Sequence, residues 1–243
     1  MIGSASSCTR PLHQALIPLA VSVPPVALFI SGRARKTEME EEQDTAPAVE
    51  RIRPPSIDEL FRVTKFSKAE IQSLYRSFKE LWPNGYVALD QFQVMYSDIF
   101  PQGNSKAYAE LVFRNIDHSK CGTITFEDFI KNYSKMAKGS KNEKFEWIFN
   151  LYDSSSTGSI GYNEIFNAIR ALYQLVDSSL KPAALATICR QHVKLVLKNF
   201  DMQCGSRISR EEFVYKCKLN PEILENLEMF DPYSKSLLNT LSV

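Results

Sequence analysis

The sequence predicts an all-α protein made of four helix–loop–helix units, with an irregular N-terminal extension and a C-terminal helix. Apolar residues recur at helical spacing from about residue 56 onward, and one loop pattern appears four times. Fifteen phenylalanines and ten tyrosines stand against only nine glycines, which favours an aromatic-cored helical protein over a turn-rich β protein. With 243 residues and 44% hydrophobic content, the chain can bury a sizeable core.

The composition changes near residue 55. No charged residue occurs between Arg10 and Arg33, and residues 12–30 are largely apolar but interrupted by prolines. An acidic stretch at 38–50 follows, which we interpret as a disordered linker. We therefore expect a variable extension at 1–55, a first pair of helix–loop–helix units at 56–138, and a second pair with a C-terminal helix at 139–232.

The third unit carries the loop pattern most completely. Its twelve-residue loop begins at Asp153, with Gly158 at position 6, Ile160 at position 8 and Glu164 at position 12. A carboxylate at position 1, a turn glycine at 6 and a bidentate Glu at 12 are the requirements of a calcium-binding EF-hand. Position 8 is apolar because it pairs with the partner loop in a short antiparallel bridge.

Loop three is the first candidate metal site because each of its side-chain ligand positions carries an oxygen donor. Only two donors are carboxylates, and affinity rises with ligand charge, so we expect a Kd on the order of 10⁻⁵ to 10⁻³ M for Ca²⁺. A structural relic without bound metal is the alternative. The candidate ligands are Asp153, Ser155, Thr157, the Ser159 carbonyl and Glu164.

Loops two and four fit the same frame with fewer ligands. Loop four offers Asp201 and Glu212 as weaker candidates, but Gly205 precedes the usual place of the turn glycine, as if that glycine had moved by one position. Loop two runs from Asp117 to Asp128, whose short side chain at position 12 favours Mg²⁺ over Ca²⁺.

Loop one is expected to be structural only. Counting back from Gly85 places its first position at Glu80, whereas the helix face that ends in Phe78 places it at Lys79. We interpret this disagreement as one inserted residue in the loop.

Four segments carry a resemblance to a known family: residues 70–79, 100–103 and 126–130 and, most specifically, Glu143-Lys-Phe-Glu-Trp-Ile-Phe-Asn-Leu-Tyr-Asp153. They resemble the neuronal calcium sensors and, among them, the potassium-channel-interacting proteins. The resemblance covers about residues 56–232, although 177–188 and the loop-one segment 82–85 depart from the family pattern. It implies a calcium-dependent regulatory subunit that cradles a helix from the N-terminus of a Shal-type potassium channel.

We expect that helix to lie in an apolar groove contributed largely by the first pair of units, the usual binding mode of paired EF-hands. The residues expected to supply the groove are aromatic. They are Tyr75, Phe78, Phe92, Tyr96, Phe113 and Phe129.

Other function classes find little support in the sequence. The net charge is +1 without a basic stripe, so nucleic acid is not a favoured partner. The three histidines are scattered, and neither a nucleophile motif nor a phosphate loop occurs, so we expect no enzyme. The five cysteines form no Cys-x-x-Cys pair, which favours a reducing compartment. A calcium-insensitive adaptor that uses the hands as a scaffold remains the alternative function.

The expected location is cytoplasmic, peripheral at the cytoplasmic face of a membrane. Ile2 stands where N-myristoylation requires glycine, so that acylation signal is missing. Residues 12–30 are expected to contact the membrane instead, and the basic flank at 33–36 would stay on the cytoplasmic side.

Overall fold

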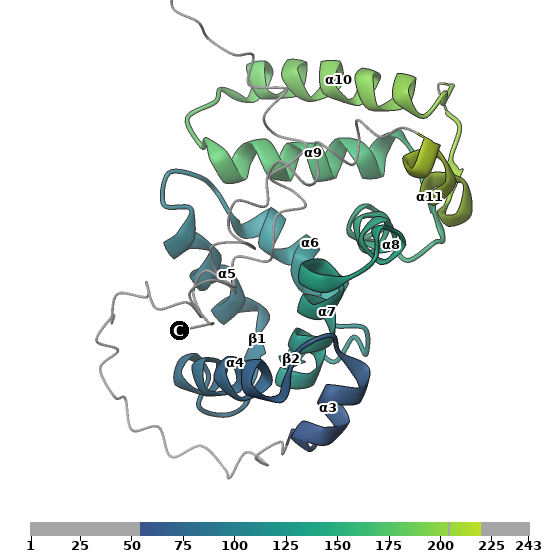
Figure 1. Ribbon diagram of the computed structural model, residues 1–243. Coiled ribbons are helices and arrows are strands. Elements are labelled where there is room, and N and C mark those ends of the chain that lie inside the picture. Colours follow the sequence, from purple (N-terminus) through teal and green to yellow (C-terminus); the bar gives the residue numbers. More distant parts are fainter. Residues whose placement is uncertain (1–53, 204, 220–243) are drawn as a thin grey trace, which may run out of the picture.

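The computed structural model describes residues 54–203 and 205–219, and this part of the chain is mostly helical, which confirms the predicted fold class (Figure 1). Nearly all of the predicted N-terminal extension, and the C-terminal helix expected after residue 219, lie outside the described residues. The elements are α3 (Ile57–Val63), α4 (Lys68–Leu81), β1 (Tyr86–Ala88), α5 (Leu89–Ile99), α6 (Lys106–Ile116), β2 (Thr123–Thr125), α7 (Phe126–Lys138), α8 (Lys141–Tyr152), β3 (Ser159–Ile160), α9 (Tyr162–Val176), α10 (Pro182–Asn199), β4 (Ile208–Ser209) and α11 (Arg210–Leu219).

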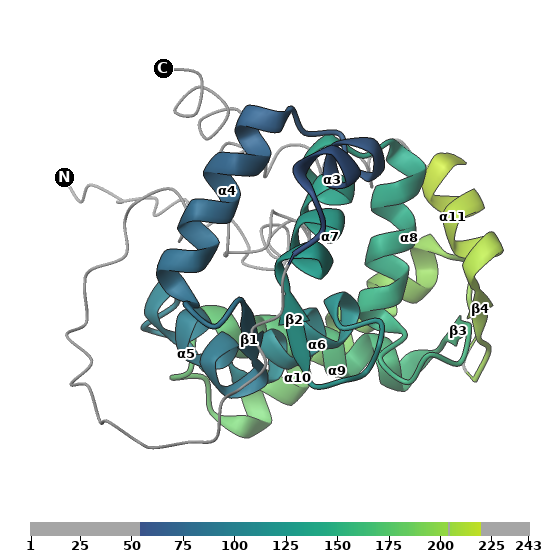
Figure 2. The ribbon, with the colours of Figure 1, turned by 90° about the horizontal axis from the view of Figure 1, so that it is seen from below.

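The loops pair as the position-8 residues predict. β1 and β2 run antiparallel with Val87 opposite Ile124, and β3 and β4 run antiparallel with Ile160 opposite Ile208. Each bridge brings two helix–loop–helix units together, so the first unit pairs with the second and the third with the fourth (Figure 2).

Two capping boxes set the starts of α4 and α8. The Ser67 hydroxyl accepts the Glu70 N–H, while the Glu70 carboxylate accepts the Ser67 N–H, and Ser140 with Glu143 repeats the arrangement. Glu70 also pairs with Lys138 at 2.6 Å, which ties the start of α4 to the end of α7. The helix starts that the sequence signals are thus also points of contact between helices.

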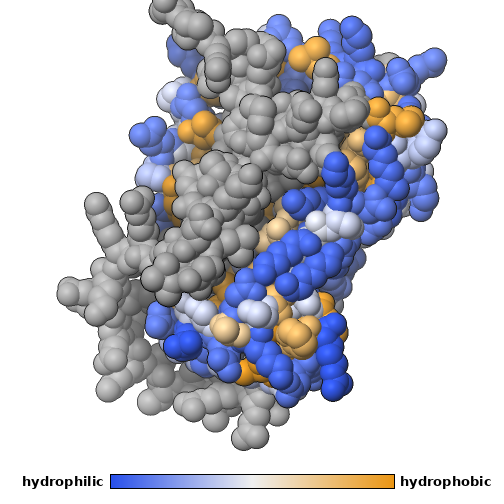
Figure 3. All heavy atoms as spheres, viewed as in Figure 1, coloured by the Kyte–Doolittle hydropathy of each residue, from blue (hydrophilic) through white to orange (hydrophobic). Residues whose placement is uncertain are grey.

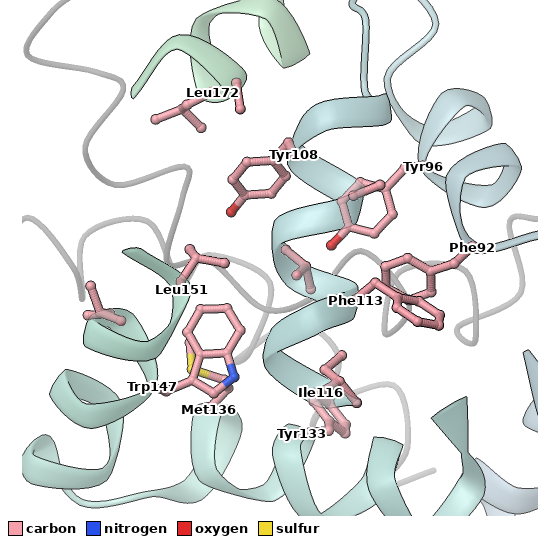
Figure 4. Close-up of a cluster of buried hydrophobic side chains, with 14 of the residues drawn as sticks. Phe92, Tyr96, Tyr108, Phe113, Ile116, Tyr133, Met136, Trp147, Leu151 and Leu172 are labelled. Carbon is pink, nitrogen blue, oxygen red and sulfur yellow. The ribbon is translucent and has the colours of Figure 1, made fainter. Parts of the chain in front are cut away.

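A single apolar core runs through both pairs of units. Figure 4 shows Tyr108 and Phe113 of α6 in the same cluster as Trp147 and Leu151 of α8, with Leu172 of α9 beside them. The two pairs therefore share a packed interior.

The aromatic side chains expected to line a groove belong largely to this core. Five of the six are buried, and Tyr75 is partly buried. Phe92 packs edge-on against Phe113 at 5.5 Å between ring centroids, and Phe78 packs against Phe129 at 5.8 Å. Ring-on-ring packing across α4–α7 and α5–α6 accounts for their burial.

The surface of the described part carries separate apolar patches. Figure 3 shows hydrophobic residues scattered between hydrophilic ones on the described part of one face. Between residues 54 and 219, residue 204 excepted, no helix combines the length and the apolarity needed to cross a membrane. The apolar segment 12–30 lies outside the described residues. The exposed large apolar side chains are Ile57, Phe61, Val63, Val94, Leu195, Tyr215 and Leu219.

The loop between α5 and α6 docks onto the end of α9. The Asn104 N–H donates to the Gln174 carbonyl at 2.6 Å, and the Gln102 carbonyl accepts the Ser178 hydroxyl at 2.8 Å. Gly103 lies so close to α9 that a Cβ there would stand 1.7 Å from the Leu175 carbonyl oxygen. Only glycine permits this approach, which couples the first pair of units to the second.

We expect Gly103→Ala to lower the free energy of unfolding by about 1–3 kcal/mol, because the added methyl group must push two backbones apart. Urea denaturation followed by circular dichroism measures the change. Gln102→Ala is the matched control, since this substitution keeps the backbone carbonyl that Ser178 uses. Equal stability of Gly103→Ala and the control would refute the close approach.

Candidate metal centre

Loop three holds its first carboxylate inward. Asp153 follows the last residue of α8 and is only 5% exposed. Its Oδ1 accepts the Thr157 N–H at 2.8 Å, and its Oδ2 accepts the Gly158 N–H at 2.7 Å. The left-handed backbone of Gly158, at φ +77°, turns these amides toward the carboxylate. The predicted turn glycine is therefore confirmed.

Further oxygens of loop three meet at the same place. The Thr157 hydroxyl oxygen is 3.1 Å from Asp153 Oδ1 and 2.9 Å from the Ser159 carbonyl oxygen. Glu164, in the first turn of α9, accepts the Gly161 N–H through Oε2 at 3.1 Å. Ser155 is exposed at position 3. Four of the five predicted ligands are thus brought together.

The guanidinium group of Arg207 lies among these oxygens. Its Nη2 donates to the Ser159 carbonyl at 2.6 Å, to Glu164 Oε1 at 3.1 Å and to the Thr157 hydroxyl at 3.3 Å. Its Nε donates to the Ser159 hydroxyl at 2.8 Å. A positively charged group of loop four therefore contacts positions 5, 7 and 12 of loop three.

The loop pattern does not point to Arg207, because position 7 of a calcium loop contributes its backbone carbonyl and its side chain has no assigned role. A signal was nevertheless present. Since Ile160 pairs with Ile208 in an antiparallel bridge, the next position places Arg207 opposite Gly161. A Cβ at Gly161 would lie 3.3 Å from the Arg207 guanidinium, so glycine leaves room for the side chain.

Hydrogen bonds lower the pKa of the Glu164 carboxyl group. Partial burial raises the pKa of this carboxyl group, but hydrogen bonds from its own N–H, from Arg207 and from the Gly161 N–H together lower the pKa below its usual value. Glu164 is therefore available as an anionic ligand at neutral pH.

The donor set of loop three fits a hard cation. Carboxylate, hydroxyl and carbonyl oxygens are the ligands that Ca²⁺ and Mg²⁺ prefer, and here a guanidinium already contacts three of them. In the described part of the chain no three His, Cys, Asp or Glu side chains gather as a metal site. The charge of loop three comes from Asp153 and Glu164 alone.

The carboxylates of loop two accept hydrogen bonds from other residues of the same loop. Asp117 is buried and accepts the Cys121 N–H at 3.1 Å, and the Cys121 thiol occupies position 5. Asp128, at position 12, accepts both the N–H and the hydroxyl of Thr125, at 3.1 and 2.6 Å, and so caps α7. Binding of Mg²⁺ here stays a prediction.

Loop four places its two weaker candidates just after α10 and in the first turn of α11. Asp201 is exposed in a left-handed conformation at φ +46°, where its N–H closes the end of α10. Glu212 pairs with Lys216 at 3.2 Å one turn along α11. Gly205 has φ +85°, which confirms that the turn glycine has moved by one position.

The structure of loop one differs from the one-residue insertion that the sequence suggested. Helix α4 continues past both candidate first positions, Lys79 and Glu80, so neither begins a loop. Trp82 is buried at the helix end, and Gly85 turns the chain into β1 at φ +87°. The misalignment therefore reflects a helix that extends over the first loop positions, because apolar packing at Trp82 continues the buried helix face.

The comparison with known families agrees with this geometry. Residues 142–218 match the family model of the EF-hand domain pair. This range covers α8 to α11 except the end residues Lys141 and Leu219, together with loops three and four and the bridge between β3 and β4. EF-hands in general bind Ca²⁺ through loops of this design. Residues 142–218 of the chain are thus similar to an EF-hand domain pair.

Proposed function

We propose that the protein is a calcium-binding regulatory protein that responds at loop three and binds a target helix. The observation that carries the proposal is the convergence of the Asp153 and Glu164 carboxylates with neutral oxygens of the same loop. The position-12 carboxylates of loops two and four have other partners, because Asp128 accepts the Thr125 hydroxyl and Glu212 pairs with Lys216.

A route from loop three to the first pair of units supports a regulatory role. Glu164 belongs to the first turn of α9, so a ligand that pulls on its carboxylate acts directly on that helix. The other end of α9 receives the α5–α6 loop through the hydrogen bond from Asn104 to Gln174. A shift of α9 is thereby transmitted to the first pair, in the way that calcium opens sensor EF-hands.

The proposed target is a helical segment of a membrane protein. The resemblance of residues 143–153 and the other segments to the potassium-channel-interacting proteins favours the N-terminus of a Shal-type channel. The protein would then act as an auxiliary subunit at the cytoplasmic face of the membrane, with residues 12–30 as the membrane contact. The aromatic core of the first pair would receive the helix after opening, in a helix-in-groove mode.

A calcium-insensitive adaptor is the second candidate. The observation that favours it is the contact between Arg207 and Glu164, which gives loop three a positive partner from within the chain. In both functions the protein is a binding module without catalysis.

Calorimetric titration with Ca²⁺ tests the site. We expect Glu164→Gln to remove most of the binding heat, because it deletes one of the two carboxylates that converge. Glu212→Gln is the matched control at position 12 of loop four and should leave the heat within about twofold of the wild-type value. The opposite ranking of the two variants would contradict the assignment to loop three.

A binding assay with a labelled peptide from a Shal-type channel N-terminus tests the partner. The full-length protein should bind the peptide in the micromolar range or tighter, and more tightly with Ca²⁺ than with EDTA. A peptide of the same composition in scrambled order should not bind. Absence of binding both with Ca²⁺ and with EDTA would eliminate the channel as the target.

A further inference from the structure

We propose that the guanidinium of Arg207 serves as a tethered cation for loop three when no metal is bound. Ca²⁺ must displace this group in order to bind. The inference rests on the proposed calcium site of loop three and concerns the regulation of that site. It assigns to a residue of loop four the control of metal affinity in its neighbour.

The contacts of Arg207 are those of a cation in the loop. Its Nη2 reaches an oxygen at position 5, one at position 7 and one at position 12, which come from a hydroxyl, a backbone carbonyl and a carboxylate. The group is thus bound by the same mixture of donors that an EF-hand presents to Ca²⁺. A Ca²⁺ ion bound to these oxygens would lie next to the positively charged guanidinium, so the two cations compete for the loop.

The loop pairing fixes Arg207 in this place. Ser209 lies opposite Ser159 and Ile208 opposite Ile160, so the side chain of Arg207 enters loop three at Gly161. Gly161 has no side chain to exclude the guanidinium, and a Cβ there would be only 3.4 Å from Arg207 Cγ. The competitor is part of the same folded unit and is present at every calcium concentration.

The charges show why the competition matters. Asp153 and Glu164 supply two negative charges, and Arg207 neutralises one of them, so an approaching Ca²⁺ meets less attraction and one repelling group. The side chain of Arg207 is 44% exposed, so it can leave into solvent. An ion pair of this exposure is weak enough for a divalent ion to displace.

The proposal predicts that Arg207→Gln binds Ca²⁺ more tightly but is less stable without metal. The Kd for Ca²⁺ should fall about tenfold, which corresponds to about 1.4 kcal/mol, because the competitor is gone. The melting temperature in EDTA should fall as well, because loop three loses its cation. Calorimetry and thermal denaturation of the full-length protein measure the two effects.

Two further variants sharpen the experiment. Arg190→Gln removes the same charge from an exposed position of α10 and should leave both quantities unchanged, which controls for net charge. Arg207→Lys keeps the charge without the planar fork and should give an intermediate Kd. If Arg207 were merely structural, its replacement by Gln would instead lower the stability and weaken calcium binding together.

The outcomes separate this inference from the proposed function. If wild type and Arg207→Gln bind Ca²⁺ equally, or Arg207→Gln binds more weakly, the inference is overturned while the calcium site stands. If only Arg207→Gln binds detectably, the inference is supported and the native protein is the calcium-insensitive adaptor. If neither binds, the displacement model and the calcium function both fail.

Discussion

The bridge between Ile160 and Ile208 is the interaction on which the second pair of units depends. These two side chains are buried, and each stands at position 8 of its loop. Their pairing places α8 to α11 around one interior, where Phe213 of α11 packs against Phe149 of α8 at 5.6 Å between ring centroids. Val87 and Ile124 do the same for the first pair. Because these contacts are apolar, they hold the loops in register whether or not a metal binds.

Because the apolar contacts that hold the loops are separate from the metal ligands, the loops can differ in their ligands within one regular fold. The carboxylate at position 12 always follows a turn into a helix, where an amide or hydroxyl of position 9 lies nearby. Asp128 uses that position as a helix cap, whereas Glu212 turns to Lys216. Glu164 caps α9 through one oxygen and offers the other to a cation. A loop that loses a ligand therefore loses its metal binding but keeps its place in the fold.

Most of the fold could be predicted from the sequence because its signals are local. Ser67 and Glu70, which are three residues apart, predict a helix start, and the apolar residue at position 8 of each loop predicts each bridge. The moved glycine of loop four was also visible, since glycine is the residue suited to a left-handed turn.

Two of the features that sequence reasoning missed, the docking of Gly103 and the role of Arg207, depend on contacts between distant segments. The docking of Gly103 on α9 has no local pattern, because the fit appears only when the two segments meet. The extension of α4 was hidden by counting loop positions from Gly85, although the spacing from Phe78 to Trp82 continues a helix face. Arg207 required knowing which residue of loop four lies opposite Gly161.

The central claim is that a guanidinium from loop four serves as the cation of loop three in the absence of calcium. Nuclear magnetic resonance of the Arg207 Nε–H tests it most directly, because this group donates to the Ser159 hydroxyl. Its resonance is assigned by its loss in Arg207→Lys. In EDTA the resonance should be shifted and protected from solvent exchange, and saturating Ca²⁺ should abolish both properties. A freely exchanging resonance in EDTA that Ca²⁺ leaves unchanged would contradict the account.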